Sequence, residues 1–179
     1  MLGGRPDRNL VSSEKGLPTE FDEAKKKNVL WSVALGTTTY GTPVVANGRI
    51  FIGTNNGNDP KDDKGVLRCF DTSGKPLWKA VHAKLETGEA EDFGGIGICS
   101  TPCVVGDAVY YVSNRAELVC CSVKDGKAVW TLDMRKELGV SPHQGSAASP
   151  LAVDDLVFTV TGHGPVSYTH LTLPTILRV

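Results

Sequence analysis

Adjacent cysteines are the residues of this chain with the most direct route to redox chemistry. Cys120 and Cys121 are neighbours, and two accessible thiols in such a pair support thiol–disulfide exchange. The pair lies inside the β-rich run 118–122, however, where a strand directs neighbouring side chains to opposite faces. A bond between such neighbours would distort the peptide, so we expect packing thiols and not a redox centre.

The other cysteines also favour a buried, unreactive state. Cys99 and Cys103 have a C-x-x-x-C spacing, but a zinc site needs a second pair of ligands and none stands nearby in the sequence. Cys69 and Cys120 occupy equivalent places in two repeats, which favours a small packing residue at both. The odd total of five argues against a complete set of disulfides within the chain.

Histidines and one polar loop supply weaker candidates for chemistry. His143 is the histidine to mutate first, although no neighbouring Ser or Cys has the flanking pattern of a nucleophile. His82 and His163 also lie in or beside expected connections, where a hydrogen-bonded loop histidine is the alternative. The loop 55–63 is rich in Asn and Asp, whose oxygens could bind calcium weakly, but ordinary turn composition favours a solvated hairpin loop.

Three copies of one pattern organise the chain that carries these residues. Each copy begins with a Thr-Pro or Ser-Pro step, continues through a short apolar run and a two-residue turn, and ends in a second β-rich run. The copies begin at Pro43, Pro102 and Pro150. Spacings near fifty residues, with several strands in each unit, predict β-propeller blades and not helical solenoids.

A tryptophan recurs with the same period. Trp31, Trp78 and Trp130 all lie in strand-like runs. Gly74 and Gly126 stand four residues before the second and the third of them. Because these residues recur with the repeat, we interpret them as blade-docking contacts, in which an indole wedges between adjacent blades and a glycine permits a tight turn. A stacking platform for a quinone or a sugar is the competing interpretation.

These patterns predict an all-β fold, a partial β-propeller of four-stranded antiparallel blades. We expect two complete blades, one incomplete blade and one closing strand around Trp31. Residues 1–27 are expected to form an N-terminal arm and residues 28–165 the partial propeller. Residues 166–179 interrupt the third repeat and resemble a translated sequencing adaptor, so we expect an artefactual tail there. One helical turn is expected at 133–138.

Charge and hydropathy exclude some classes of function. A formal net charge of −1 gives no long-range field for nucleic acid. No stretch approaches the ~20 apolar residues that a membrane-spanning helix needs. The first residues lack the apolar core of a signal peptide, and we expect the natural start to lie further upstream.

The Gly-Lys step before tryptophan resembles the tryptophan-docking motif A-x-D-x-x-x-G-K-x-x-W of pyrroloquinoline quinone (PQQ) repeat β-propellers. The second repeat matches the Gly-Lys step and the tryptophan (126–130), but Cys120 and Ser122 replace the alanine and the aspartate. The first repeat keeps the aspartate, the Gly-Lys step and the tryptophan (71–78), with one residue fewer before the glycine. The segment 16–31 is also similar to the start of PQQ-like propellers from planctomycete-type bacteria.

The resemblance implies a superfamily that mixes quinoprotein dehydrogenases with non-enzymatic scaffolds, among them the lipoprotein subunit of the outer-membrane β-barrel assembly machinery. Because the strong signals are architectural, we expect a non-catalytic binding or scaffold module of the bacterial periplasm or cell envelope. Its ligand would be a protein or a small molecule, such as a peptide or carbohydrate, on the inter-blade loop face. The alternative is part of an alcohol or sugar dehydrogenase that uses PQQ and calcium. In the alcohol dehydrogenases a disulfide between adjacent cysteines lies against the cofactor, a role that would fall to Cys120 and Cys121.

Overall fold

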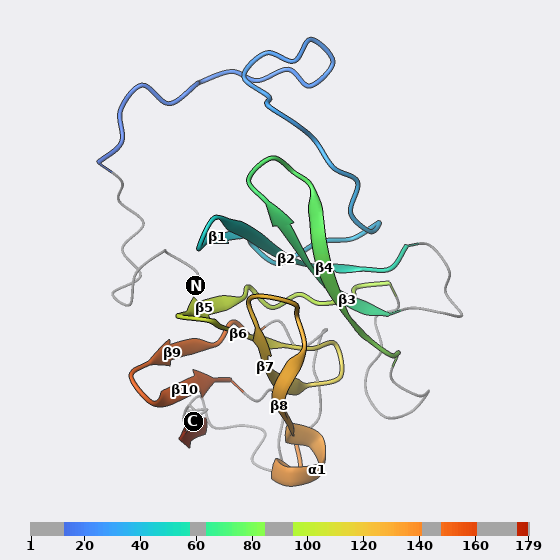
Figure 1. The fold of residues 1–179 in the computed structure, drawn as a ribbon. Helices are drawn as coiled ribbons and strands as arrows, with labels where there is room; N and C mark the ends of the chain where they lie inside the picture. The colour runs from blue at the N-terminus through green and yellow to red at the C-terminus, as the bar shows by residue number, and fades with distance from the viewer. Residues whose placement is uncertain (1–12, 58–63, 85–94, 141–147, 161–174, 179) are drawn as a thin grey trace.

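Three antiparallel sheets, formed in chain order, make up the β-structure (Figure 1). The computed structural model describes residues 13–57, 64–84, 95–140, 148–160 and 175–178. Blade one contains β1 (Val44–Ala46), β2 (Arg49–Asn55), β3 (Gly65–Asp71) and β4 (Pro76–His82). Blade two contains β5 (Cys103–Val105), β6 (Ala108–Val112), β7 (Glu117–Ser122) and β8 (Ala128–Asp133). The third sheet contains β9 (Leu151–Val153), β10 (Leu156–Thr159) and β11 (Thr175–Arg178). The all-β partial propeller expected from the repeats is confirmed.

The turns and faces of the blades follow from the sequence. The β1–β2 hairpin turns at Asn47 and Gly48, whose φ angles of 52° and 68° lie in the left-handed region that Asn and Gly tolerate best. Alternate residues of each strand face opposite sides of a blade. The two faces of blade two therefore enter two separate apolar cores.

The first of these cores is the contact between the facing sheets of blade one and blade two, called the seam below. Blade one contributes Phe51 and Leu67 to it, and blade two contributes Val109 and Val119, all of them buried. The other face of blade two forms a second core with the third sheet and with buried Met134. Burial of these apolar side chains between stacked sheets is the main force that holds the blades together.

The expected helical turn is present as α1 (Met134–Leu138). The Asp133 carboxylate accepts hydrogen bonds from the backbone N–H groups of Arg135 and Lys136, and Gly139 ends the helix in the left-handed conformation. No helix in the described part of the chain is long and apolar enough to cross a membrane.

Two segments differ from the expectation. The chain around Trp31 forms no strand, because no described strand lies beside it to complete a hydrogen-bonded ladder. It is held instead by the Arg68 guanidinium, which donates to the Ala34 carbonyl (3.3 Å). Inside the range expected to be a tail, β11 pairs with β10 as a third strand of the last sheet. The artefactual origin of residues 166–179 stays a prediction.

The hydroxyl residue before each repeat proline links neighbouring blades. The backbone N–H of Thr42 donates to Oγ1 of Thr101 (3.0 Å), and the N–H of Thr101 donates to Oγ of Ser149 (3.1 Å). Thr101 is buried, so its hydroxyl replaces water as the partner of a backbone donor. The Thr-Pro and Ser-Pro steps of the sequence are therefore inter-blade contacts.

We expect Thr101→Val to lower the free energy of unfolding by about 1–2 kcal/mol, because it leaves the N–H of Thr42 without an acceptor. Thr101→Ser keeps the hydroxyl, as the third repeat does with Ser149, and should cost clearly less. Urea unfolding followed by circular dichroism compares the two variants. Equal stabilities would show that this hydrogen bond contributes nothing.

Candidate functional site

The structure pairs each of two tryptophans with a glycine on the blade that follows it. The ring of Trp31 lies against Gly74, and its Nε1–H donates to the Thr72 carbonyl (2.9 Å). The ring of Trp78 lies against Gly126, and its Nε1–H donates to the Val123 carbonyl (2.9 Å). The two contacts repeat one geometry.

Trp130 occupies the same place in blade two. Its ring lies 6.0 Å from that of Tyr110, centroid to centroid, and it packs against the core between blade two and the third sheet. The docking role of the three indoles and of Gly74 and Gly126 stays a prediction.

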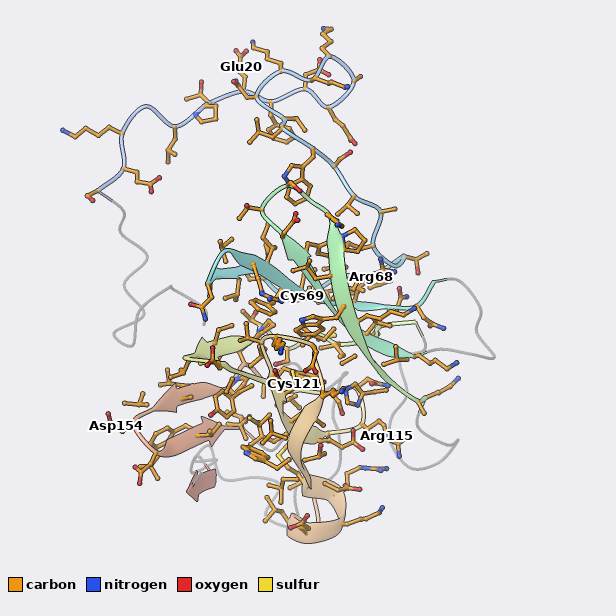
Figure 2. All side chains as sticks on the ribbon, in the orientation of Figure 1. Glu20, Arg68, Cys69, Arg115, Cys121 and Asp154 are labelled. Atoms are coloured by element: carbon orange, nitrogen blue, oxygen red, sulfur yellow. The ribbon has the colours of Figure 1, made fainter. Side chains whose placement is uncertain are left out.

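Cys120 and Cys121 lie on opposite faces of β7. Cys120 enters the core with the third sheet. Cys121 enters the seam core, which also contains Cys69 of blade one (Figure 2 labels Cys69 and Cys121). All five thiols are free and buried. Burial raises the pKa of Cys121 to about 12, with the neighbouring Cys120 and Cys69 adding to the effect, and burial raises the pKa of Cys99 to about 11. Such thiols are poor nucleophiles at neutral pH.

Asn55 corrects one expectation about the loop 55–63. It is not a solvated loop residue but the last residue of β2, and it is fully buried. Its Oδ1 accepts from the N–H of Thr37 (2.7 Å), and its Nδ2 donates to Oγ1 of Thr37 (2.8 Å) and to the Gly95 carbonyl (2.6 Å). Asn55 therefore fixes two connections to the edge of blade one, and its side chain is not available to a calcium ion.

Several other sequence candidates have no described position. His143 and His163 lie outside the described residues, as do residues 58–63 of the polar loop. In the part that the structure does describe, no group of three or more His, Cys, Asp or Glu side chains is placed to hold a metal ion. The thiols at 120 and 121 are buried on opposite faces of β7, which does not fit a disulfide held against a cofactor.

The structure reveals a polar cluster in the seam that the sequence analysis missed. His82, at the end of β4, reaches across to blade two, where its Nδ1 lies 3.1 Å from Oε2 of Glu117 and its Nε2 lies 2.7 Å from the Tyr111 hydroxyl. Ser113 donates to the same carboxylate oxygen (2.9 Å), and Nε of Arg115 donates to the other (3.1 Å). These five residues are called the seam cluster below.

Arg115 of the seam cluster and its neighbour Asn114 also hold the connection that leaves blade one. Arg115 donates to the Lys84 carbonyl (3.0 Å), and Asn114 donates to the Ala83 carbonyl (3.1 Å). Both donors belong to the β6–β7 turn of blade two (Figure 2 labels Arg115). The turn of one blade therefore sets the path of the neighbouring connection on the loop face.

The electrostatics of the seam cluster centre on Glu117, whose side chain is 16% exposed. Burial alone would raise its pKa, but hydrogen bonds from His82, Ser113 and Arg115, together with the electrostatic effect of His82, lower the pKa to about 2. Burial raises the pKa of Tyr111, and the nearby Cys121 and Glu117 raise it further. Tyr111 is only 1% exposed, so its hydroxyl can bond within the cluster but cannot reach an external substrate.

A pH dependence of stability follows from Glu117. Its pKa is lower in the folded chain, about 2, than its ordinary value of 4.5, so its contribution is complete above pH 4.5 and is lost as pH falls towards 2. We expect a loss of about 2–3 kcal/mol over that window. Urea unfolding at several pH values should show a shallower acid loss in Glu117→Gln; an identical acid loss in both proteins would contradict the assignment.

The sequence of this chain matches one family model. The family model described as outer membrane protein assembly factor BamB matches residues 62–172. No curated protein matches the chain. BamB from Moraxella catarrhalis is a similar solved structure, with 18% identity, a TM-score of 0.41, and coverage of 68% of this chain and 30% of that one.

Two enzymes have similar solved structures. Quinohemoprotein alcohol dehydrogenase from Comamonas testosteroni has 16% identity, a TM-score of 0.46, and coverage of 68% of this chain and 17% of that one. A europium-containing methanol dehydrogenase has 14% identity, a TM-score of 0.48, and coverage of 72% and 21%. The chain spans less than a third of each of the three structures. Because the family model matches more than half of the chain, this protein belongs to the family described as outer membrane protein assembly factor BamB.

Proposed function

We propose that this chain is part of a protein-binding β-propeller that serves the assembly of outer membrane proteins in the bacterial cell envelope. The observation that carries the proposal is the match of residues 62–172 to the family model. The seam supports it, because a rigid scaffold needs blades in fixed positions and the seam cluster ties two blades together with satisfied polar groups.

The loop face of the seam is the surface we assign to ligand binding. The connection at 83–84 and the turn at 113–117 meet there, held by Asn114 and Arg115. Loops on a rigid scaffold are the usual place for recognition. Hydrogen bonds to the carbonyls at 83 and 84 hold this part of the connection in place, which lowers the entropic cost of binding. The proposed ligand is a protein.

Deletion of the gene that encodes the complete protein tests the proposal. Outer membranes are isolated, and their integral proteins are quantified by mass spectrometry against inner-membrane proteins from the same cells. We expect the outer membrane proteins to fall several-fold and to recover when the wild-type gene is restored. Unchanged outer membrane proteins would contradict the proposal.

A second assay separates the scaffold from a dehydrogenase. The purified complete protein is incubated with PQQ and calcium, and dye reduction is measured with alcohols and sugars as substrates. We expect no reduction that depends on the cofactor. Substrate-dependent turnover would show that the protein is a dehydrogenase and would contradict the scaffold proposal.

A further inference from the structure

One arginine departs from the repeat at the end of the seam that carries the hairpin turns. Arg49 begins β2, whereas Ala108 and Leu156 begin the equivalent strands β6 and β10. Arg49 and Phe51 are two residues apart in β2 and lie on the same face, which is the seam face. A cation therefore stands in this seam at a position where the following sheets have an apolar residue.

Arg49 reaches across the seam to blade two. Its Nη1 donates to the carbonyls of Val123 (3.0 Å) and Lys124 (3.2 Å), at the start of the β7–β8 turn. Both acceptors are neutral, and Arg49 takes part in no ion pair among the described residues. The hydrogen bonds thus fix the position of the guanidinium but do not balance its positive charge.

A pocket of about 420 Å³ opens beside Arg49, at the turn end of the seam. It is lined by residues of both blades: Asn47, Arg49, Gly106, Asp107, Val123 and Lys124. Nδ2 of Asn47 donates to the Gly106 carbonyl (2.8 Å), so the β1–β2 and β5–β6 turns, which Figure 1 shows on the same side of the sheets, are bonded to each other. Both blades have all four strands, so this pocket is not an open end of the partial ring.

Charges of both signs line this pocket without pairing with one another. Lys124 adds a second cation beside Arg49, and Asp107 adds a carboxylate. Neither Lys124 nor Asp107 takes part in an ion pair within the described parts of the chain. An anionic ligand alone would be repelled by Asp107, and a cationic ligand alone would be repelled by the two cations. The arrangement therefore favours a ligand that carries both a negative and a positive group.

We propose that this pocket binds a small aminoalkyl phosphate monoester. Its phosphate would accept hydrogen bonds from Arg49 and Lys124, and its ammonium group would donate to Asp107. A phosphate monoester carries a charge of about −1.5 to −2 at neutral pH, which matches two cations, and one ammonium group matches one carboxylate. The pocket lies at the opposite strand ends from the loop face, so this site is separate from the one proposed for a protein ligand.

Soluble probes test the proposal by NMR titration of the purified chain. O-Phosphoethanolamine carries both charged groups, whereas ethyl phosphate has the same phosphate ester but no ammonium group. Binding is followed through the backbone N–H signals of Gly106, Asp107 and Lys124. We expect O-phosphoethanolamine to bind about tenfold more tightly than ethyl phosphate, because its ammonium group adds a charge-assisted contact. Glycerophosphoethanolamine, a diester like a lipid headgroup, should bind more weakly than the monoester. Tighter binding of the diester would assign the pocket to phospholipid headgroups and would overturn the monoester proposal.

Variants of the chain complete the test. D107N should abolish the preference for O-phosphoethanolamine over ethyl phosphate. K124Q should weaken the binding of both probes several-fold, and it leaves the hydrogen bonds of Arg49 across the seam in place because these use only the backbone carbonyl of Lys124. D125N removes a carboxylate from the same turn, outside the pocket lining, and should keep the preference. Absence of binding, equal binding of the two probes, or a preference that D107N retains would overturn the proposal.

Discussion

Gly126→Ala is expected to lower the free energy of unfolding by about 3 kcal/mol or more. Gly126 has a φ of 71°, and a Cβ added to it would lie 2.4 Å from Cε3 of Trp78. The indole cannot move away freely, because its Nε1–H bonds to the Val123 carbonyl and its ring packs 5.8 Å from Phe51, centroid to centroid. The substitution therefore combines backbone strain with a clash inside the seam.

Gly106→Ala is the matched control for this prediction. Gly106 also has a positive φ, 55°, but a Cβ there would meet no atom within 4 Å. Only the strain of a non-glycine residue at positive φ remains, so we expect a loss of about 1 kcal/mol in the free energy of unfolding. Urea unfolding followed by tryptophan fluorescence compares the two variants with the parent chain. If they lose the same stability, the contact between Trp78 and Gly126 does not dock the blades, and the docking interpretation of the repeat fails.

The architecture was predictable because its signals are local and repeated. The Asn47-Gly48 turn, the β-rich runs and the period near fifty residues define four-stranded blades without any knowledge of tertiary contacts. The partner of each tryptophan was not predictable in the same way. Gly126 follows Trp78 by a whole repeat, and only the stacking of the blades shows that the turn glycine of one blade receives the indole of the preceding one.

The seam cluster escaped the sequence analysis for the same reason. His82 and Glu117 are 35 residues apart and belong to different blades, so no spacing rule connects them. One signal was available. The strand register gives Glu117 in blade two the position that Val66 has in blade one, so a charged residue stands where the other blade has an apolar one. A charged side chain at such a position needs hydrogen-bond partners from a neighbouring element.

Asn55 shows the opposite error, in which composition was misleading. Its neighbours in the sequence are polar, and a stretch of Asn, Asp and Gly is typical of an exposed loop. β2 nevertheless extends as far as Asn55. The side-chain amide of Asn55 forms hydrogen bonds with backbone and hydroxyl groups of two connections. Composition predicts that a loop exists, but it does not predict which polar residue becomes a buried anchor.

Glu117→Val should have the second large effect, a loss of about 3 kcal/mol in the free energy of unfolding. The substitution places in blade two the residue that blade one has at the equivalent position, Val66. Without the carboxylate, Arg115 and His82 lose their acceptor while they remain largely buried, with side chains 23% and 15% exposed. Removal of one member of a buried charged group is costly mainly because of the partner left behind.

Asp125→Asn is the control for a carboxylate of ordinary surface type. Asp125 pairs with Lys127 at 3.6 Å, and the two side chains are 42% and 84% exposed, so water screens the pair and its loss should change stability little. A double variant gives a sharper test: His82→Met, which introduces the residue found one repeat later at Met134, should recover part of the loss in Glu117→Val. Recovery would show that the orphaned polar partner, and not the missing attraction, dominates the cost. Purely additive effects of the two substitutions would mean that His82 and Glu117 do not interact across the seam.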